Sequence, residues 1–462
     1  MEFKKYNDEH YLDLCRFFKA LNFDKRHINW NWARLEWMIG HPYLDLFNKD
    51  KMGLWYDKDK IVGAAIYDLG LGEAFVNVLP GYENLYQEVL DYAYNNLQDD
   101  NGLGISVNDD NKEEIEFLTK NGFKKVEQRE TILKKDIDKH YPVIVKEGLR
   151  IKNVNPYLKV DEMQWLFWQG FDHGDNKDEC FAEENDNLFV RPNFEPYLSI
   201  CIENKKKEMV AYCSFWYDKE TDYAYLEPLC VIPSYRRQGL AKALVYELMN
   251  RVKELGSKEV YVISDQEFYK RIGFKECQTY SFYWKKKIVE VNSHPYIILR
   301  LLGKGKGGYS YLAERDGQYV TLKQIHHEPC SYYKFGNKIE AEMRDYERIK
   351  NAGIRIPHLI EIDINNERIV KEYIEGRTIF EMVDNDESVD RYLPQVYEMA
   401  SKAKEAGINI DYFPTNFIVR DDVLYYIDYE CNNYMEEWNF ENWGIKYWSK
   451  TKEFLEYIKN KK

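Results

Sequence analysis

The stretch Val231-Ile-Pro-Ser-Tyr-Arg-Arg-Gln-Gly-Leu-Ala241 decides the fold of the middle of this chain. It closes a run of aromatic and β-branched residues, Tyr223–Val231, that is typical of a strand. Behind it, residues 239–254 carry leucine or valine at every fourth position, which predicts a helix that ends at Gly256. Lys258–Ser264 then has the composition of a short buried strand. Strand, glycine turn, helix and strand together predict a parallel crossover.

The turn itself has the features of a phosphate cradle. Backbone N–H groups in the first turn of a helix lack internal partners, and the helix dipole gives that end a partial positive charge. Gly239 lets a diphosphate approach the backbone, while Arg236 and Arg237 offer charge-assisted contacts. Because glycine is also common where a helix packs closely on a strand, the sequence leaves both interpretations of Gly239 open.

The whole run resembles the cofactor signature of the GNAT superfamily of acetyl-CoA-dependent N-acetyltransferases. In this sequence the signature falls on Arg236, Gly239 and Ala241. The resemblance implies acetyl-CoA as cofactor and transfer of its acetyl group to an amine, for which we expect a cationic small molecule. The cofactor contacts that it implies are Val231, Arg236, Arg237, Gly239, Leu240 and Ala241.

Two side chains are candidates for the proton transfers of such a reaction. Tyr269 matches the place where many members of the family carry the tyrosine that protonates the coenzyme A sulfur, although a phenol there could also belong to the core. Glu227 is a candidate general base if it faces the cleft, and otherwise a structural carboxylate. Seven carboxylates between Asp172 and Asp186 are typical of a solvated loop, or of a mouth that attracts a cationic amine.

An earlier part of the chain repeats this pattern. Residues 78–88 echo 231–241 at an offset of 153 positions, and residues 117–124 echo 268–275 at an offset of 151. The sequence therefore predicts two copies of one α/β unit. At the positions of Arg236, Gly239, Ala241 and Tyr269 the first copy has Glu83, Tyr86, Glu88 and Leu118. A carboxylate repels a diphosphate and a tyrosine fills the space above a glycine, so we expect the first copy not to bind coenzyme A.

The last third of the chain has a different pattern. Leu302-Gly-Lys-Gly-Lys-Gly-Gly-Tyr-Ser310 lies between two strand-like runs, and such a hairpin can cover a triphosphate. Lys323, one strand later, can pair with the phosphate oxygens. Glu342 on the predicted helix that follows is placed to pair with Lys323, with Glu340 and Glu347 as alternatives. The glycines expected to approach the nucleotide are Gly303, Gly305 and Gly308.

Three further polar residues fit phosphoryl transfer. Asp411 precedes Asn416 by five positions, and Asp428 ends an apolar strand. We expect Asp411 to orient the attacking hydroxyl, and Asn416 and Asp428 to bind Mg²⁺ through their oxygens. With the strand-to-hinge segment Lys371–Gly376, these residues resemble the protein-kinase-like superfamily, nearer to aminoglycoside phosphotransferases than to true protein kinases. The resemblance implies ATP and Mg²⁺ as cofactors.

This part departs from the kinase pattern in ways that leave its activity open. Asn409 stands where a histidine is usual, and the metal motif is Asp-Tyr-Glu in place of Asp-Phe-Gly. It is therefore a phosphotransferase, a nucleotide-binding regulator of the acetyltransferase without catalysis, or a domain that only mimics the kinase pattern. A further interpretation is that the whole chain is a binding protein without enzymatic activity.

Composition narrows the function classes. The chain has 462 residues and a formal net charge of −14, which favours two to four domains and argues against nucleic acid as the partner. No apolar run is long enough to span a bilayer, and the N-terminus has no secretory pattern, so we expect a cytoplasmic protein with no membrane partner. Eight cysteines without CxxC pairs indicate reduced, mostly buried thiols.

The sequence thus predicts an α/β (α+β) chain with three parts. Residues 1–140 form a degenerate GNAT-like domain and residues 148–287 a GNAT acetyltransferase domain, each with a mixed sheet. Residues 288–462 form a small two-lobed kinase-like domain. The sequence does not decide the oligomeric state or the identity of the two acceptors.

Overall fold

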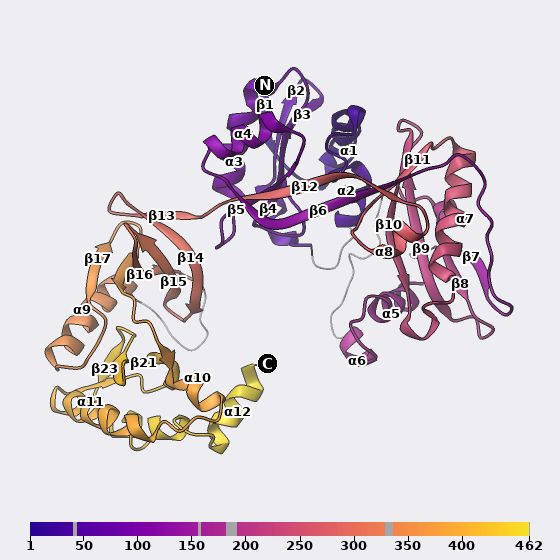
Figure 1. Ribbon diagram of the computed structural model, residues 1–462. Coiled ribbons are helices and arrows are strands. Elements are labelled where there is room, and N and C mark those ends of the chain that lie inside the picture. Colours follow the sequence, from indigo (N-terminus) through magenta and orange to yellow (C-terminus); the bar gives the residue numbers. More distant parts are fainter. Residues whose placement is uncertain (40–43, 156–158, 182–191, 329–335, 462) are drawn as a thin grey trace. The chain divides into compact units, whose positions relative to one another are not determined.

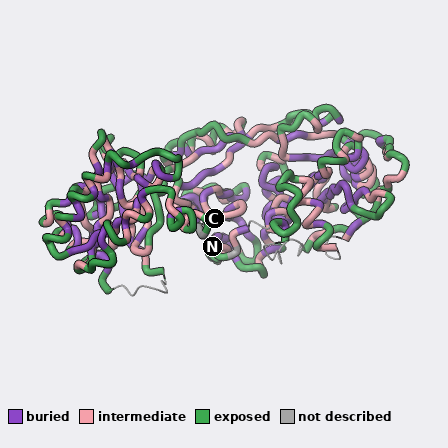
Figure 2. Tube along the Cα trace, turned by 90° about the horizontal axis from the view of Figure 1, so that it is seen from below, coloured by how far each residue is buried: buried purple, intermediate pink, exposed green. Residues whose placement is uncertain are grey.

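The computed structural model describes residues 1–39, 44–155, 159–181, 192–328 and 336–461 (Figure 1). The chain divides into two compact units, Met1–Lys285 and Lys286–Lys462. Buried residues run through the inside of each unit and exposed residues cover it (Figure 2). Helices and sheets occur in both units, so the predicted mixed α/β class is confirmed.

One sheet of twelve strands runs through the first unit in the order β1-β2-β3-β4-β5-β12-β6-β11-β10-β9-β8-β7. Strand pairs are antiparallel except for β4–β5 and β10–β11, which are parallel, as a crossover requires. One end of the sheet contains β1 (Glu2–Lys5), β2 (Gly53–Asp57), β3 (Lys60–Tyr67), β4 (Glu73–Val78) and β5 (Leu103–Asn108). The other end contains β7 (Arg150–Asn153), β8 (Ser199–Glu203), β9 (Met209–Tyr217), β10 (Tyr223–Val231) and β11 (Glu259–Ile263).

The two central strands are exchanged between the halves of this unit (Figure 1). β6 (Lys124–Asp136) follows the first half in sequence but pairs with β11, and β12 (Lys275–Lys285) follows the second half but pairs with β5. The two strands also pair with each other. Neighbouring residues of β6 consequently pack in different hydrophobic cores. Ile132 lies in the core of the first half and Leu133 in that of the second. Each half is completed by a strand of the other.

Helices cover the sheet in matching places of both halves. The first half has α1 (Tyr11–Leu21), α2 (Trp32–Ile39), α3 (Tyr86–Asn96) and α4 (Lys112–Lys120). The second half has α5 (Val160–Gly170), α6 (Lys177–Cys180), α7 (Leu240–Leu255) and α8 (Glu267–Arg271). The predicted helix 239–254 is thus α7, and it ends at Gly256, which has a φ of 108°. Its buried face includes Leu240, Leu244, Leu248 and Val252, the residues of the four-residue pattern.

The second unit begins with a six-stranded sheet and continues into a mainly helical part. The sheet has the order β13-β14-β15-β16-β18-β17, and the helix α9 (Lys338–Asn351) follows β16 in sequence. Its strands are β13 (Ile288–Val291), β14 (His294–Lys304), β15 (Gly308–Arg315), β16 (Gln318–Ile325), β17 (Leu359–Asp363) and β18 (Arg368–Glu372). The second part contains α10 (Ile379–Asp384), α11 (Leu393–Glu405), α12 (Lys452–Lys461), β19 (Arg377–Thr378), β20 (Ile408–Ile410), β21 (Phe417–Arg420), β22 (Val423–Tyr426) and β23 (Cys431–Asn433).

Two expectations about the whole chain, on membrane spans and on cysteines, can be compared with the described residues. Among these residues, no helix combines the length and apolar character needed to cross a membrane. Seven of the predicted thiols are described as free cysteines, and all of them except Cys277 are buried. Cys330 lies outside the described residues.

Candidate active sites

The first candidate site lies where β10 and β11 stop pairing. Their parallel register joins Tyr223–Tyr225 to Glu259–Tyr261, yet β10 continues to Val231. A β-bulge between Leu226 and Leu229 turns β10 away at this point. The glycine loop follows at the end of β10, and α8 follows β11. The predicted loop and the predicted proton donor are therefore carried by the two strands that diverge.

The loop has the backbone of an anion-binding turn. Arg237 and Gly239 both have positive φ, 60° and 83°, and α7 starts directly afterwards at Leu240. The N–H groups of Leu240 and Ala241 belong to the first helical turn and so have no partner within the helix. Apart from Gly239 and its two chain neighbours, no atom of the described residues lies within 4 Å of the position that a Cβ on Gly239 would take. Close helix–strand packing therefore does not explain this glycine, whereas its φ and the open space above it do.

Arg236 is engaged by the protein itself. Its guanidinium donates to the carbonyl oxygens of Val231 and Gly170, at 2.9 Å each, and forms a 3.0 Å ion pair with Asp172. These contacts join the loop to the end of α5, so Arg236 fixes the loop's position. Arg237 is exposed on the same loop and is the arginine better placed for a phosphate. Of the predicted acidic segment, Glu183, Glu184 and Asp186 lie outside the described residues.

Tyr269 and Glu227 share one neighbourhood. The phenol of Tyr269 is 7 % exposed, and burial, followed by the charges of Cys213 and Glu227, raises its pKa well above the usual value. It therefore keeps its proton at neutral pH, as an acid must before it donates. Glu227 is half-buried on the bulge of β10, where its carboxylate accepts a 3.1 Å hydrogen bond from Tyr225. The charge of Glu227 thus acts on the phenol of Tyr269, while the ring of Tyr269 packs in the core of the second half.

In the first half, another segment of the chain contacts β4 and β5 at the point where these two strands stop pairing. β4 and β5 pair only at Glu73–Ala74 with Gly104–Ile105. Beyond that point, Asn77 of β4 donates to the ring of His27 at 3.2 Å, and Asn108 of β5 donates to the carbonyl oxygen of Arg26 at 3.2 Å. The segment between α1 and α2 therefore contacts both strands where they part.

The first-half loop also lacks a cradle. Tyr86, at the position of Gly239, donates its hydroxyl to Glu114 at 2.7 Å, and its ring lies 4.8 Å from the ring of Phe117. Glu83, at the position of Arg236, accepts from the backbone N–H of Gly81 at 2.9 Å. A carboxylate thus uses a backbone donor that an anion would need. The side chains of Glu83 and Tyr86 are thus both engaged within the first half.

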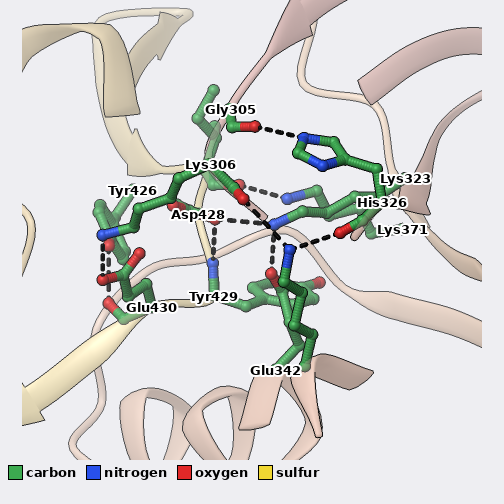
Figure 3. A network of polar contacts seen from close by, with 12 residues as sticks. Gly305, Lys306, Lys323, His326, Glu342, Lys371, Tyr426, Asp428, Tyr429 and Glu430 are labelled. Carbon is green, nitrogen blue, oxygen red and sulfur yellow. Dashed lines mark hydrogen bonds and ion pairs between the residues drawn. The ribbon is translucent and has the colours of Figure 1, made fainter. Parts of the chain in front are cut away.

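The second candidate site is a buried ion-pair network in the second unit (Figure 3). Lys323 of β16 is 8 % exposed, pairs with Glu342 of α9, and lies 3.5 Å from the carboxylate of Asp428. Although burial alone would lower the pKa of Lys323, Asp428 and Glu342 hold it above the usual value. Of the three glutamates that the sequence allowed, Glu342 is the one that makes the contact.

Asp411 and Asn416 lie beside this network. The side-chain amide of Asn416 donates to the backbone carbonyl oxygen of Asp411 at 3.4 Å. The backbone carbonyl oxygen of Asn416 accepts from the N–H of Ile427, the residue before Asp428, at 2.8 Å. Burial and the charge of Asp428 raise the pKa of Asp411, although a hydrogen bond from the backbone N–H of Phe413 acts in the opposite direction. Lys323 and Lys371 outweigh burial and lower the pKa of Asp428.

These oxygens suit a metal that is shared with a nucleotide. Within the described ranges, no group of three or more His, Cys, Asp or Glu side chains has the arrangement of a complete metal site. Mg²⁺ usually takes one or two protein oxygens and completes its shell with phosphates and water. Asn416 and Asp428 fit that donor set, with ATP supplying the remaining oxygens.

The glycine loop of this unit lies over the ion pair. A Cβ on Gly308 would lie 2.6 Å from the carbonyl oxygen of Gln324, so the backbone approach there requires glycine. A Cβ on Gly307 would lie 3.9 Å from the Lys323 ammonium. Gly305 donates its N–H to Gly308 at 2.9 Å, which closes the hairpin, and Gly303 lies within β14.

Three residues of this site were missed by the sequence analysis. Lys306, at the tip of the loop, forms a 2.6 Å ion pair with Glu430. Lys371 of β18 donates to the carbonyl oxygen of Ile427 at 2.5 Å. Glu430 could have been found from its place in the Asp-Tyr-Glu motif, but a lysine in a glycine loop or in a strand is too common to signal a site.

A comparison with protein families assigns the middle of the chain. Residues 159–274 match the model of the acetyltransferase (GNAT) family. This part of the chain has the GNAT fold. The match contains the cradle loop, Glu227 and Tyr269, while the first half and the second unit lie outside it.

Two groups of curated proteins resemble stretches of the chain. The KEOPS complex subunit Bud32 of Pyrococcus abyssi is 34 % identical over 91 residues, which are 19 % of this chain and 41 % of that protein. An uncharacterized N-acetyltransferase of Escherichia coli K12, YhbS, is 37 % identical over 57 residues, 12 % of this chain and 34 % of that protein. The chain thus spans less than half the length of each of these relatives.

Solved structures with GNAT domains are also similar. A tandem GNAT protein from the clavulanic acid biosynthesis pathway covers 61 % of this chain and 97 % of its own at 14 % identity, with a TM-score of 0.43. A GCN5-related N-acetyltransferase from Sphaerobacter thermophilus covers 62 % of this chain and 95 % of its own at 12 % identity, with a TM-score of 0.38.

Proposed function

We propose that the second half of the first unit is an acetyl-CoA-dependent N-acetyltransferase that acts on a small cationic amine. The observation that carries this proposal is the positive-φ loop Arg237–Gly239 that opens α7 at the end of β10, the strand that also carries Glu227, whose charge acts on the buried phenol of Tyr269. Acetyl-CoA supplies the thioester carbonyl. The first-turn N–H groups of α7 and the side chain of Arg237 hold its diphosphate, and Arg236 keeps the loop in place.

The proton transfers follow from the side chains of Glu227 and Tyr269. Glu227 accepts a proton from the ammonium form of the amine, so that the nitrogen lone pair can attack the carbonyl carbon. The bond from that carbon to sulfur then breaks, Tyr269 gives its proton to the leaving sulfur, and the second proton of the nitrogen returns through water to the Tyr269 oxygen, which leaves a neutral amide. Because positioning supplies much of the rate in such a transfer, either residue alone contributes only part of it.

The first half, in this proposal, is a second GNAT-like copy that has lost coenzyme A binding. Tyr86, Glu83 and the segment around His27 occupy the places that a cofactor would need. Its retained role is to complete the fold through β6, which pairs with β11 of the acetyltransferase half.

We further propose that the second unit is a kinase-like domain that transfers phosphate from ATP, with Mg²⁺, to a hydroxyl group. The Lys323–Glu342 pair with Asp428 beside it carries this proposal, and the similarity to Bud32 supports it. Asp411 orients the hydroxyl, and Asn416 and Asp428 hold the metal. We place the protein in the cytoplasm, with no nucleic acid or membrane as partner.

Calorimetric titration of the full chain with acetyl-CoA tests the first proposal. One site per chain is expected. The double substitution Arg236→Glu, Gly239→Tyr should abolish it, whereas the matched pair Glu83→Gln, Tyr86→Phe should leave it unchanged. Absence of binding would overturn the acetyltransferase assignment, and two sites would overturn the assignment of the first half.

Titration with Mg·ATP, followed by an assay of ATP turnover, tests the second. Turnover that is lost in Asp411→Asn supports a phosphotransferase. Binding without turnover, together with a change in the acetyl-transfer rate, would show a nucleotide-binding regulator. A chain that binds neither cofactor would be a binding protein without catalysis.

A further inference from the structure

Lys306 places a third ammonium group among the carboxylates of the kinase-like site. Its Nζ is 2.6 Å from Glu430, and both side chains are partly buried, with 31 % and 24 % of their surface exposed. Figure 3 shows the side chain extending from the loop past Asp428 toward Glu430.

The backbone that carries Lys306 is held independently of this ion pair. Lys338, in the first turn of α9, donates to the carbonyl oxygens of Lys306, at 3.3 Å, and of His326. The ring of His326 contacts the carbonyl oxygen of Gly305 at 2.9 Å. The side chain of Lys306 can therefore change its partner by rotation about its own bonds while the loop stays in place.

The charges around the loop favour such a change. Lys323 is already shared by Glu342 and Asp428, and Lys371 donates to a carbonyl oxygen. A triphosphate that enters beneath the loop meets the carboxylates of Asp411, Asp428 and Glu430, which repel it. Lys306 is the lysine at the loop's tip, and in this structure its partner, Glu430, is only partly buried.

We propose that Lys306 is a phosphate-binding residue that leaves Glu430 and pairs with the terminal phosphate when a nucleoside triphosphate binds. This inference rests on the proposed function, namely that the second unit binds ATP. Because the tip of a glycine hairpin covers the terminal phosphate, the contact favours a triphosphate over a diphosphate. Without a nucleotide, Glu430 keeps the ammonium paired in a site that is partly shielded from water.

The test is the affinity of the full chain for Mg·ATP and Mg·ADP, measured by calorimetry for four proteins. Lys306→Met should weaken ATP binding about tenfold, the loss of one charge-assisted contact, and ADP binding by less than about twofold. Lys306→Arg should restore most of the ATP affinity. Lys304→Met is the matched control, because Lys304 is the last residue of β14, directly before the loop, and pairs with the exposed Glu328. It should bind both nucleotides like the wild type.

Each outcome of these titrations supports or overturns the proposed role of Lys306. Unchanged ATP affinity in Lys306→Met, or an equal loss for ATP and ADP, would overturn the role of Lys306 and leave ATP binding by the unit intact. A loss that Lys306→Arg does not reverse would also overturn it, since the charge would then not be the cause. A wild-type chain that binds neither nucleotide would overturn the proposed kinase-like function, and this inference with it.

Discussion

The hydroxyl of Ser281 in β12 donates a 2.6 Å hydrogen bond to Asp109, the residue that follows β5. Thr279 of β12 donates to the other carboxylate oxygen of Asp109, also at 2.6 Å. Two residues from the end of the second half thus bind one carboxylate of the first half. Together with the pairing of β12 and β5, this contact makes the two halves one folding unit.

Asp109→Ala is therefore expected to destabilise both halves of the first unit together. Losing two side-chain hydrogen bonds should lower the free energy of unfolding by about 1–3 kcal/mol. Thermal unfolding followed by calorimetry should show one transition for residues 1–285 that moves as a whole. The neighbouring exposed Asp110→Ala is the control and should leave it in place. Two separate transitions would contradict the exchange of strands.

Gly239→Ala and Gly256→Ala should have similar effects on stability but different effects on acetyl-CoA binding. Both glycines have positive φ, 83° and 108°, so each alanine should cost about 1 kcal/mol of stability. Only Gly239 lies in the cradle, and only its substitution should weaken acetyl-CoA binding. Denaturant unfolding and calorimetric titration of both variants measure the two effects. Equal loss of binding in both would mean that strain in α7, and not the cradle, is responsible.

Substitutions of Arg236 and of Arg237 should differ in their effects on stability and on acetyl-CoA binding, measured in the same two ways. Arg236 donates to Val231 and Gly170 and pairs with Asp172, so Arg236→Gln should lower stability by about 1 kcal/mol and also weaken acetyl-CoA binding. Arg237 is exposed, and Arg237→Gln should weaken binding without a change in stability. If Arg236→Gln were as stable as the wild type, its anchoring role would be wrong.

Lys371 should make the stability of the second unit depend on pH. Burial and the charge of Lys323 lower its pKa from 10.5 to about 8. Between these values the unfolded chain holds the proton that the folded chain has lost, so the free energy of unfolding rises with pH from about 8 to 10.5. Below pH 8 the buried, protonated Lys371 lowers the free energy of unfolding by about 3 kcal/mol, for a pKa shift of this size.

The check is denaturant unfolding of the full chain at pH 7.5 and at pH 10. Lys371→Met should remove most of the rise that the wild type shows between the two values. Lys402→Met, a substitution of a partly exposed lysine on α11, is the control and should keep this rise. A rise of the same size in Lys371→Met would show that other groups cause it.

Local signals in the sequence determined the parts of the site that depend on a short segment. Leucine at every fourth position and the glycines at 239 and 256 define α7, because helix periodicity and positive φ are properties of neighbouring residues. The glycine loop, Lys323, Asp411 and Asp428 were predicted in the same way, from residue types at fixed spacing. The internal repeat likewise predicted that Tyr86 and Glu83 replace the cradle.

Contacts between distant segments were decided only by the tertiary structure. β6 and β12 have the same place in their repeats, and nothing in either strand tells which half it will pair with, since both choices satisfy the same backbone hydrogen bonds. The choice of Glu342 over Glu340 and Glu347 depends on how α9 is rotated against β16. The pairing of Lys306 with Glu430 joins residues 124 positions apart, and only folding brings those two charges together.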